Sequence, residues 1–158
     1  MPATTNPEKK LPTPSLENLR TLRPAIHPNC VVCSPTHPFG LHMNFRVTED
    51  SKLAATFDCS QRFEGYTDRL QGGVVSSLMD GIMANCMFAC GIPAVTAELA
   101  TRFRHPVKTD VPAELIAEIV SESHGIYFLK AKLIQEGQLR ATAKGKFIEM
   151  PKNQANQL

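Results

Sequence analysis

The chain has 158 residues, of which 42% are hydrophobic and 20% charged, and its net charge is +2. This ordinary globular mixture excludes wholesale disorder, and the balanced charge gives no electrostatic case for a nucleic-acid partner. No apolar run reaches the roughly 18–20 residues of a membrane-spanning helix, and no apolar secretory segment opens the chain. Five cysteines without an export signal favour reduced thiols, so we expect a cytoplasmic protein without a membrane partner.

Proline marks where the folded unit is expected to begin, because eight of the twelve prolines lie in the first 38 residues. We therefore expect residues 1–26 to form a Pro-rich N-terminal tail. A short helical turn at 15–20, capped by Ser15, is the one regular element expected there. Residues 27–150 are expected to form a single domain, followed by a polar C-terminal tail at 151–158.

Most of the domain shows the two-residue period of β-strands. Alternating apolar residues predict strands at 41–47 and 53–57, joined as a hairpin. Three later alternating runs, at 115–119, 127–133 and 139–147, are separated by the turns His124-Gly125 and Glu136-Gly137. The outer row of the first run is acidic and those of the next two are basic, which suits an antiparallel meander.

One segment breaks this pattern and predicts a helix. After Gly72-Gly73, apolar residues continue to Cys90 on all sides of a helix rather than on one stripe, and Gly91 ends the run. Such a helix must be buried nearly all round. Alanine and glycine on the late strands leave room for it, so we predict an α+β fold: a curved antiparallel sheet wrapped around one long central helix.

Asp80 is the only acidic or basic side chain between residues 69 and 98, on the most apolar segment of the chain. A carboxylate there is costly unless it is paired or hydrogen-bonded. It is therefore either a functional carboxylate or part of a solvated stripe with Ser76, Ser77 and Asn85. The spacing alone leaves both interpretations open.

Gly72 and Gly73 supply free N–H groups at the positive end of the same helix, which can bind an anion or a developing oxyanion. The alternative is a plain helix-entry turn. Asp80 follows Gly72 by eight residues, which is about 12 Å along a helix. The two groups cannot both reach one carbonyl, so a site that uses both must take them from two subunits across a two-fold axis.

The stretch Leu70–Asp80 resembles the helix-entry motif His-Gly-Gly-x5-6-Asp/Glu of hotdog-fold acyl-CoA thioesterases of the PaaI-like group. Two further blocks resemble the same group in the same order: Cys30–Cys33 followed by Pro38–Leu41, and Val95–Leu99 through Arg102–Val107. The resemblance covers about residues 30–149. It implies a hotdog fold, the same sheet-and-helix architecture that the periodicity predicts.

The resemblance also implies roles for single residues. Asp80 would be the nucleophile or the general base on water, the Gly72 N–H would polarise the thioester carbonyl, and Thr96 would help to orient the water. The motif histidine is Gln71 here, which can donate a hydrogen bond but cannot titrate. The Asn or Gln that usually precedes the motif by six residues is Gly65.

The implied reaction is hydrolysis of an acyl-CoA thioester to free acid and CoA by a homodimer or a dimer of dimers. No cofactor is expected, because CoA is part of the substrate. Gly73, Arg102, Arg104 and Lys108 are candidates for contacts with the substrate. The alternatives are a non-catalytic acyl-CoA binder, which Gln71 and Gly65 favour, and a hotdog hydratase or dehydratase, which typically needs a histidine at the site.

Cys30-x2-Cys33, flanked by His27 and His37, has half the spacing of a zinc site. No second Cys-x2-Cys occurs in the chain. We therefore expect free thiols and no metal, with Cys2His2 zinc as the alternative.

Overall fold

The computed structural model describes residues 10–151 and 154. Its helices are α1 (Leu16–Ile26), a short 3-10 helix (Gln61–Phe63) and α2 (Gly72–Ala89). Its strands are β1 (Asn44–Val47), β2 (Leu53–Phe57), β3 (Ala94–Phe103), β4 (Ala113–Ser123), β5 (Ile126–Gln135) and β6 (Gln138–Glu149).

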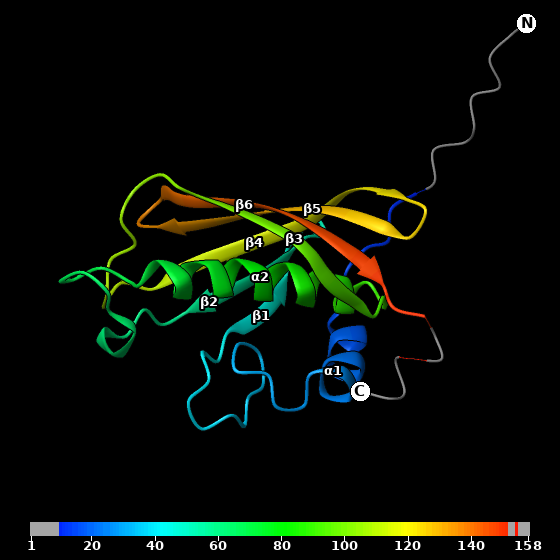
Figure 1. Ribbon diagram of the computed structural model, residues 1–158, viewed down its shortest axis with the longest axis horizontal. Helices are drawn as coiled ribbons and strands as arrows, with labels where there is room; N and C mark the ends of the chain where they lie inside the picture. Colours follow the sequence, from blue (N-terminus) through cyan, green and yellow to red (C-terminus); the bar gives the residue numbers. More distant parts are fainter. Residues whose placement is uncertain (1–9, 152–153, 155–158) are drawn as a thin grey trace, which may run out of the picture.

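The strands form one antiparallel sheet of six in the order β1-β2-β4-β5-β6-β3, which curves over α2 (Figure 1). The predicted architecture is confirmed. β4, β5 and β6 make the expected meander, and Glu118 lies opposite Lys130 with an ion pair at 3.3 Å. At the β4–β5 turn His124 and Gly125 both have positive φ, 52° and 78°, as a two-residue hairpin of this twist requires.

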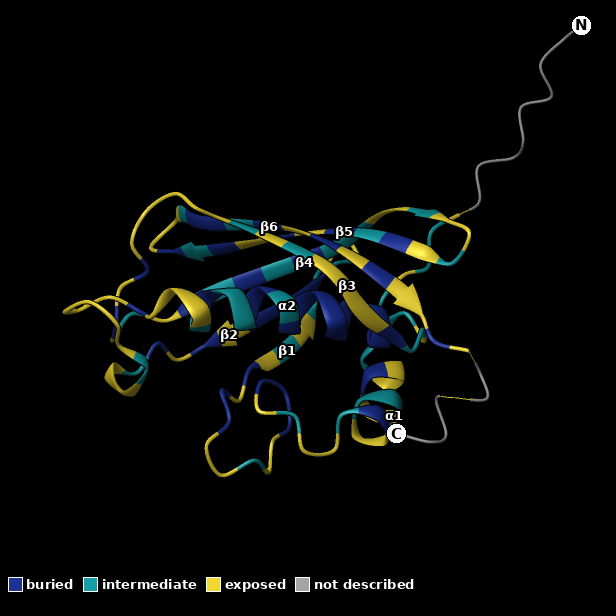
Figure 2. Cartoon of the chain, viewed as in Figure 1, coloured by how far each residue is buried: buried dark blue, intermediate teal, exposed yellow. Residues whose placement is uncertain are grey.

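From Leu78 to Ala89 every residue of α2 except Asp80 is buried, as its apolar composition predicts (Figure 2). On one side the sheet approaches so closely that a Cβ at Gly145 of β6 would lie 3.1 Å from the Met83 side chain. On another side the loop between α1 and β1 covers it, and a Cβ at Gly81 would lie 2.3 Å from Val32. Among the described residues, neither α1 nor α2 combines the length and apolar content needed to cross a membrane.

The segment 16–26 differs from the expected tail. Ser15 caps α1 as predicted, accepting from the Asn18 N–H at 3.1 Å, but the helix continues to Ile26. Leu19 and Ile26 are buried, and the Ser15 N–H donates to the Ala89 carbonyl of α2 at 2.8 Å. The proline-rich composition concealed this apolar stripe, because Pro24 lies inside the last turn of the helix. Residues 1–9 and most of 151–158 lie outside the described part of the chain.

Candidate active site

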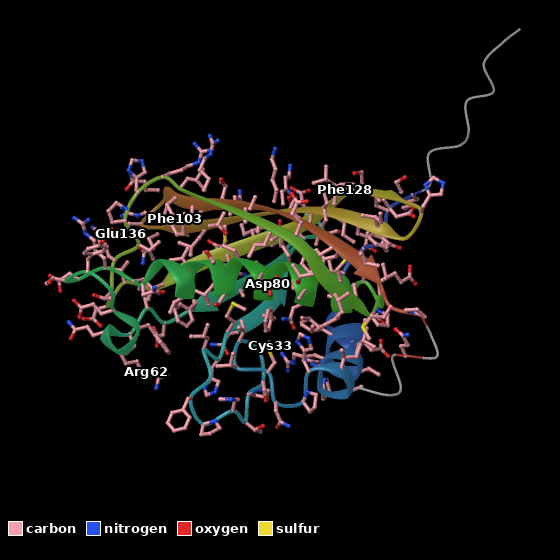
Figure 3. All side chains as sticks on the ribbon, viewed as in Figure 1. Cys33, Arg62, Asp80, Phe103, Phe128 and Glu136 are labelled. Atoms are coloured by element: carbon pink, nitrogen blue, oxygen red, sulfur yellow. The ribbon has the colours of Figure 1, made fainter. Side chains whose placement is uncertain are left out.

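Asp80 is the only charged residue of α2, and it lies half-buried at the centre of that helix (Figure 3). The hydroxyl of Thr96, on the neighbouring strand β3, donates to Asp80 Oδ1 at 2.7 Å. This bond fixes one carboxylate oxygen, and no hydrogen bond from a described residue reaches Oδ2. Asn85 does not share a solvated stripe with Asp80, as one interpretation of the sequence proposed, because Asn85 is fully buried.

A β-bulge in β3 brings Thr96 to Asp80. In the pairing with β6, Thr96 lies opposite Phe147 and Glu98 lies opposite the next residue, Lys146, so Ala97 is the extra residue. In a regular strand Thr96 and Glu98 would point to the same face. The bulge separates them: Glu98 reaches Lys146 on the outer face, and Thr96 turns toward α2. Bulges next to active sites commonly re-aim a side chain in this way.

The N-terminus of α2 forms a second cluster. Gln71 is the N-cap, and its Oε1 accepts from the Val74 N–H at 2.9 Å. The hydrogen bonds of the described residues give no acceptor to the N–H groups of Gly72 and Gly73, which are exposed. The ring of Phe103 lies beside them, 3.7 Å from where a Cβ on Gly72 would stand. This helix end is therefore an open donor site with an aromatic wall.

The loop before α2 packs closely around Gln71. The Gln71 N–H donates to the Phe63 carbonyl at 2.9 Å, and a Cβ on Gly65 would lie 3.0 Å from the Gln71 Cα. The two departures from the family pattern are thus neighbours in space. Any side chain at position 65, including the asparagine of the family pattern, would require the loop to shift. The close packing against Gln71 therefore favours glycine at this position.

Asp80 and Thr96 form one cluster, and Gly72, Gly73 and Gln71 form another at the N-terminus of α2. Within one chain the two clusters lie apart. Eight residues of one straight helix separate them by about 12 Å. Phe103 was not predicted as a site residue. Its position at the end of an apolar strand was the only signal in the sequence.

The strand β3 is an edge of the sheet, and it is exposed along most of its ten residues. Val95 and Phe103, large apolar side chains of this strand, are 49% and 55% exposed. A long, uncovered edge strand presents a row of N–H and C=O groups that can pair with another strand. Thr96 lies on this edge strand, so the Asp80 cluster is close to the surface where a partner could pair.

The three cations predicted to contact the substrate have different surroundings. Arg102 and Arg104 are exposed, and Arg104 lines a groove of about 470 Å³ on the outer face of the sheet together with four lysines: Lys52, Lys130, Lys132 and Lys144. Lys108 instead forms an ion pair with Glu136 at 2.9 Å, and this pairing holds the pKa of Glu136 below its usual value. The arginines are therefore freer than Lys108 to bind an anionic ligand.

The predicted Cys-x2-Cys pair lies in the loop that covers α2 (Figure 3 labels Cys33). His27 joins it, with Nδ1 3.6 Å from the Cys33 Sγ, whereas the cluster does not include His37. Hydrogen bonds from Cys33 and then from His27 lower the pKa of Cys30 to about 3. The bond with Cys30, followed by burial, raises the pKa of Cys33 above its usual range.

The family model of the thioesterase superfamily matches residues 69–141, a range that contains Gly72, Asp80 and Thr96. This match confirms the resemblance predicted from the sequence motifs. A comparison with curated proteins finds no match.

Several solved structures share the fold. The PaaI protein of the E. coli phenylacetic acid degradation operon is 14% identical, with a TM-score of 0.71 over 85% of this chain and 95% of that one. A phenylacetic acid degradation-related protein from Ralstonia eutropha JMP134 is 20% identical, with a TM-score of 0.65 over 73% of this chain and 91% of its own.

A hypothetical thioesterase from Streptococcus pneumoniae TIGR4, solved with coenzyme A, is 15% identical, with a TM-score of 0.65 over 69% of this chain and 89% of that one. The same protein has also been solved with an aspartate and with a threonine replaced by alanine. Those two positions are 16 residues apart, the separation between Asp80 and Thr96.

Proposed function

Because this chain carries a thioesterase-superfamily domain of the hotdog fold, we propose that it hydrolyses an acyl-CoA thioester to free acid and CoA. The observation that carries the proposal is the hydrogen bond from Thr96 to Asp80, 2.7 Å long. It gives the one charged group of a mostly apolar helix a fixed orientation and engages only one of its two carboxylate oxygens. The aspartate and threonine replaced in the coenzyme A-binding S. pneumoniae protein, at the same separation, support the assignment.

In the proposed reaction Asp80 acts as general base, or as nucleophile, toward the thioester carbonyl carbon. As base, its free Oδ2 takes a proton from water while the Thr96 oxygen accepts the second water hydrogen. The water oxygen bonds to the carbonyl carbon, and the resulting tetrahedral intermediate expels the CoA thiolate. That thiolate then takes up a proton, so the products are the free acid and CoA.

The negative charge of the intermediate needs donors close to its oxygen, at about 3 Å. The N–H groups of Gly72 and Gly73 are suited to this role because they have no acceptor within the described part of the chain and stand at the positive end of α2. They are too far along α2 to serve the Asp80 of their own chain. We therefore place Asp80 of one subunit opposite Gly72 of a partner in a homodimer or dimer of dimers, with the exposed edge of β3 as the pairing surface.

The remaining contacts follow from charge and exposure. Arg102 and Arg104 lie on or just after β3, so they are well placed to bind the CoA phosphates of a substrate that enters along this strand. Phe103 lies between them in the sequence and lines the donor site. The reaction needs no cofactor, because the carboxylate, the hydroxyl and the backbone amides supply each proton transfer and charge contact.

A specific observation favours a second candidate, the non-catalytic acyl-CoA binder. The Gln71 Oε1 is occupied in capping α2, so the position of the motif histidine serves helix structure here. A binder would use the same cations and donor site without turnover.

The test is release of free thiol from aryl-, short-chain and long-chain acyl-CoAs by the full-length chain. We expect turnover of at least one class, with a loss of at least about a hundredfold in Asp80→Asn. Asp110→Asn is the matched control, because Asp110 lies outside both clusters and should retain full activity. Binding of acyl-CoA without thiol release would contradict hydrolysis and favour the binder.

A further inference from the structure

Three metal-ligating side chains that the proposed reaction does not use meet in the loop between α1 and β1. The ligand atoms of His27, Cys30 and Cys33 all lie within 4.8 Å of one another. This loop rests on α2, where Val32 faces Gly81. Both His27 and His37 flank the cysteines in sequence, and the structure brings only His27, the C-cap of α1, into the cluster.

The distances suit a metal ion. Zinc bonds of about 2.3 Å to sulfur and 2.0–2.1 Å to nitrogen, in tetrahedral geometry, place the two ligand atoms about 3.6 Å apart. The His27 Nδ1 and Cys33 Sγ are 3.6 Å apart. Thiolate and imidazole are the ligand types that zinc prefers over magnesium or calcium.

The ligands are also held in place without an ion. His27 is the C-cap of α1, with its N–H bonded to the Arg23 carbonyl at 2.7 Å, and its ring packs edge-on against Phe88 at 4.9 Å. The two cysteines are held in one turn by the Ser34 N–H, which donates to the Cys30 carbonyl at 3.0 Å. Binding would therefore require little reorganisation of the loop.

A second observation concerns Asn85, a buried polar residue beside the cluster. Asn85 of α2 is fully buried, and its side chain lies beside the Cys33 thiol. Its Nδ2 donates to the Gly81 carbonyl at 2.7 Å, but its Oδ1 has no hydrogen-bond partner among the residues that the structure describes. A buried acceptor without a donor is costly, and a metal-bound water at this point would supply the donor.

We propose that His27, Cys30 and Cys33 bind one Zn²⁺, with a water as fourth ligand that donates to Asn85 Oδ1. The ion would join the end of α1 and the following loop into one unit resting on α2, so its role is structural. This proposal replaces the expectation of a metal-free cysteine pair, which considered only the sequence spacing.

The test is metal analysis of the full-length protein, purified with reducing agent and without chelator. We expect about one zinc per chain in the wild type, and less than a tenth of that in Cys30→Ser, which removes one thiolate. Cys90→Ser is the matched control, because Cys90 is half-buried outside the cluster and should leave the zinc content unchanged.

If Cys30→Ser does not fold, cobalt provides a second measurement on the wild type. Co²⁺ added to chelator-treated protein should produce a thiolate charge-transfer band and the visible bands of a four-coordinate ion. Wild-type protein with neither zinc nor these bands would overturn the proposal, as would equal zinc in folded Cys30→Ser. Neither readout depends on hydrolysis, so failure here is distinct from failure of the proposed function.

Discussion

Thr96 donates to Asp80 at 2.7 Å because a bulge at Ala97 turns the threonine toward α2. Without that extra residue Thr96 would lie on the outer face with Glu98, which reaches Lys146 there. The hydrogen bond between strand and helix is thus a property of the local backbone. The site depends on β3 keeping its register with β6.

Loss of the threonine hydroxyl should weaken catalysis more than folding. In Thr96→Ala we expect turnover to fall by about 1–3 kcal/mol of transition-state stabilisation, the range of one lost hydrogen bond to a charged group. Thr96→Ser keeps the hydroxyl and should retain most of the activity. Steady-state kinetics with melting temperatures measure both, and equal turnover in Thr96→Ala and wild type would remove Thr96 from the mechanism.

Gln71 has a structural role that can be separated from a catalytic one. Gln71→Ala removes the cap on Val74 and should lower the free energy of unfolding by about 0.5–2 kcal/mol. Gln71→Ser restores a side-chain cap without the amide. If the amide also contacts the substrate, turnover should stay low in Gln71→Ser while stability recovers, and Gln71→His should retain or raise turnover. Full turnover in Gln71→Ser would assign this position to helix capping alone.

The sequence predicts the sheet and central helix well because their periods are regular. The late strands alternate over most of their length between the turns, and apolar residues occur on all sides of the helix. The bulge leaves no such mark: Val95, Ala97 and Leu99 alternate with Thr96 and Glu98, which predicts the wrong face for Thr96. Only the family resemblance drew attention to that residue.

The N-terminal region was harder to predict for a different reason. Pro24 and the prolines around it obscured the apolar stripe of α1, although a proline in the last turn still permits the helix. Because α1 was not expected to continue to residue 26, the position of His27 beside Cys33 could not be foreseen. His27 and His37 were indistinguishable in sequence, and only the end of α1 separates them.

The donor role of Gly72 can be tested without disturbing the helix. Gly72 is the first residue of α2, where proline is tolerated, and Gln71 has φ −62° and ψ 135°, which suit a residue before proline. Gly72→Pro should therefore fold. Because proline has no N–H to donate, its kcat should fall by a factor of about 10²–10³. Gly72→Ala keeps the N–H, and its Cβ would meet Phe103 at an ordinary 3.7 Å, so it should remain active. Comparable activity in both variants would exclude the oxyanion role.

Pairing through β3 should be sensitive to charge on that edge. Val95→Lys places a lysine on the exposed strand, a substitution that opposes edge-to-edge pairing, so we expect dissociation toward monomer and loss of turnover. Val120→Lys is the control, since Val120 is equally exposed but lies on the interior strand β4. Sedimentation velocity distinguishes them, and an active monomeric wild type would contradict the shared site.

The most direct test of the shared site mixes two inactive variants. A subunit with Asp80→Asn still offers the Gly72 N–H, and a subunit with Gly72→Pro still offers Asp80. In a mixed dimer these intact halves meet in one of the two sites. Random pairing of equal amounts should then restore about a quarter of wild-type turnover, although each variant alone is nearly inactive. A mixture of verified heterodimers no more active than its separate components would contradict an active site built from two subunits.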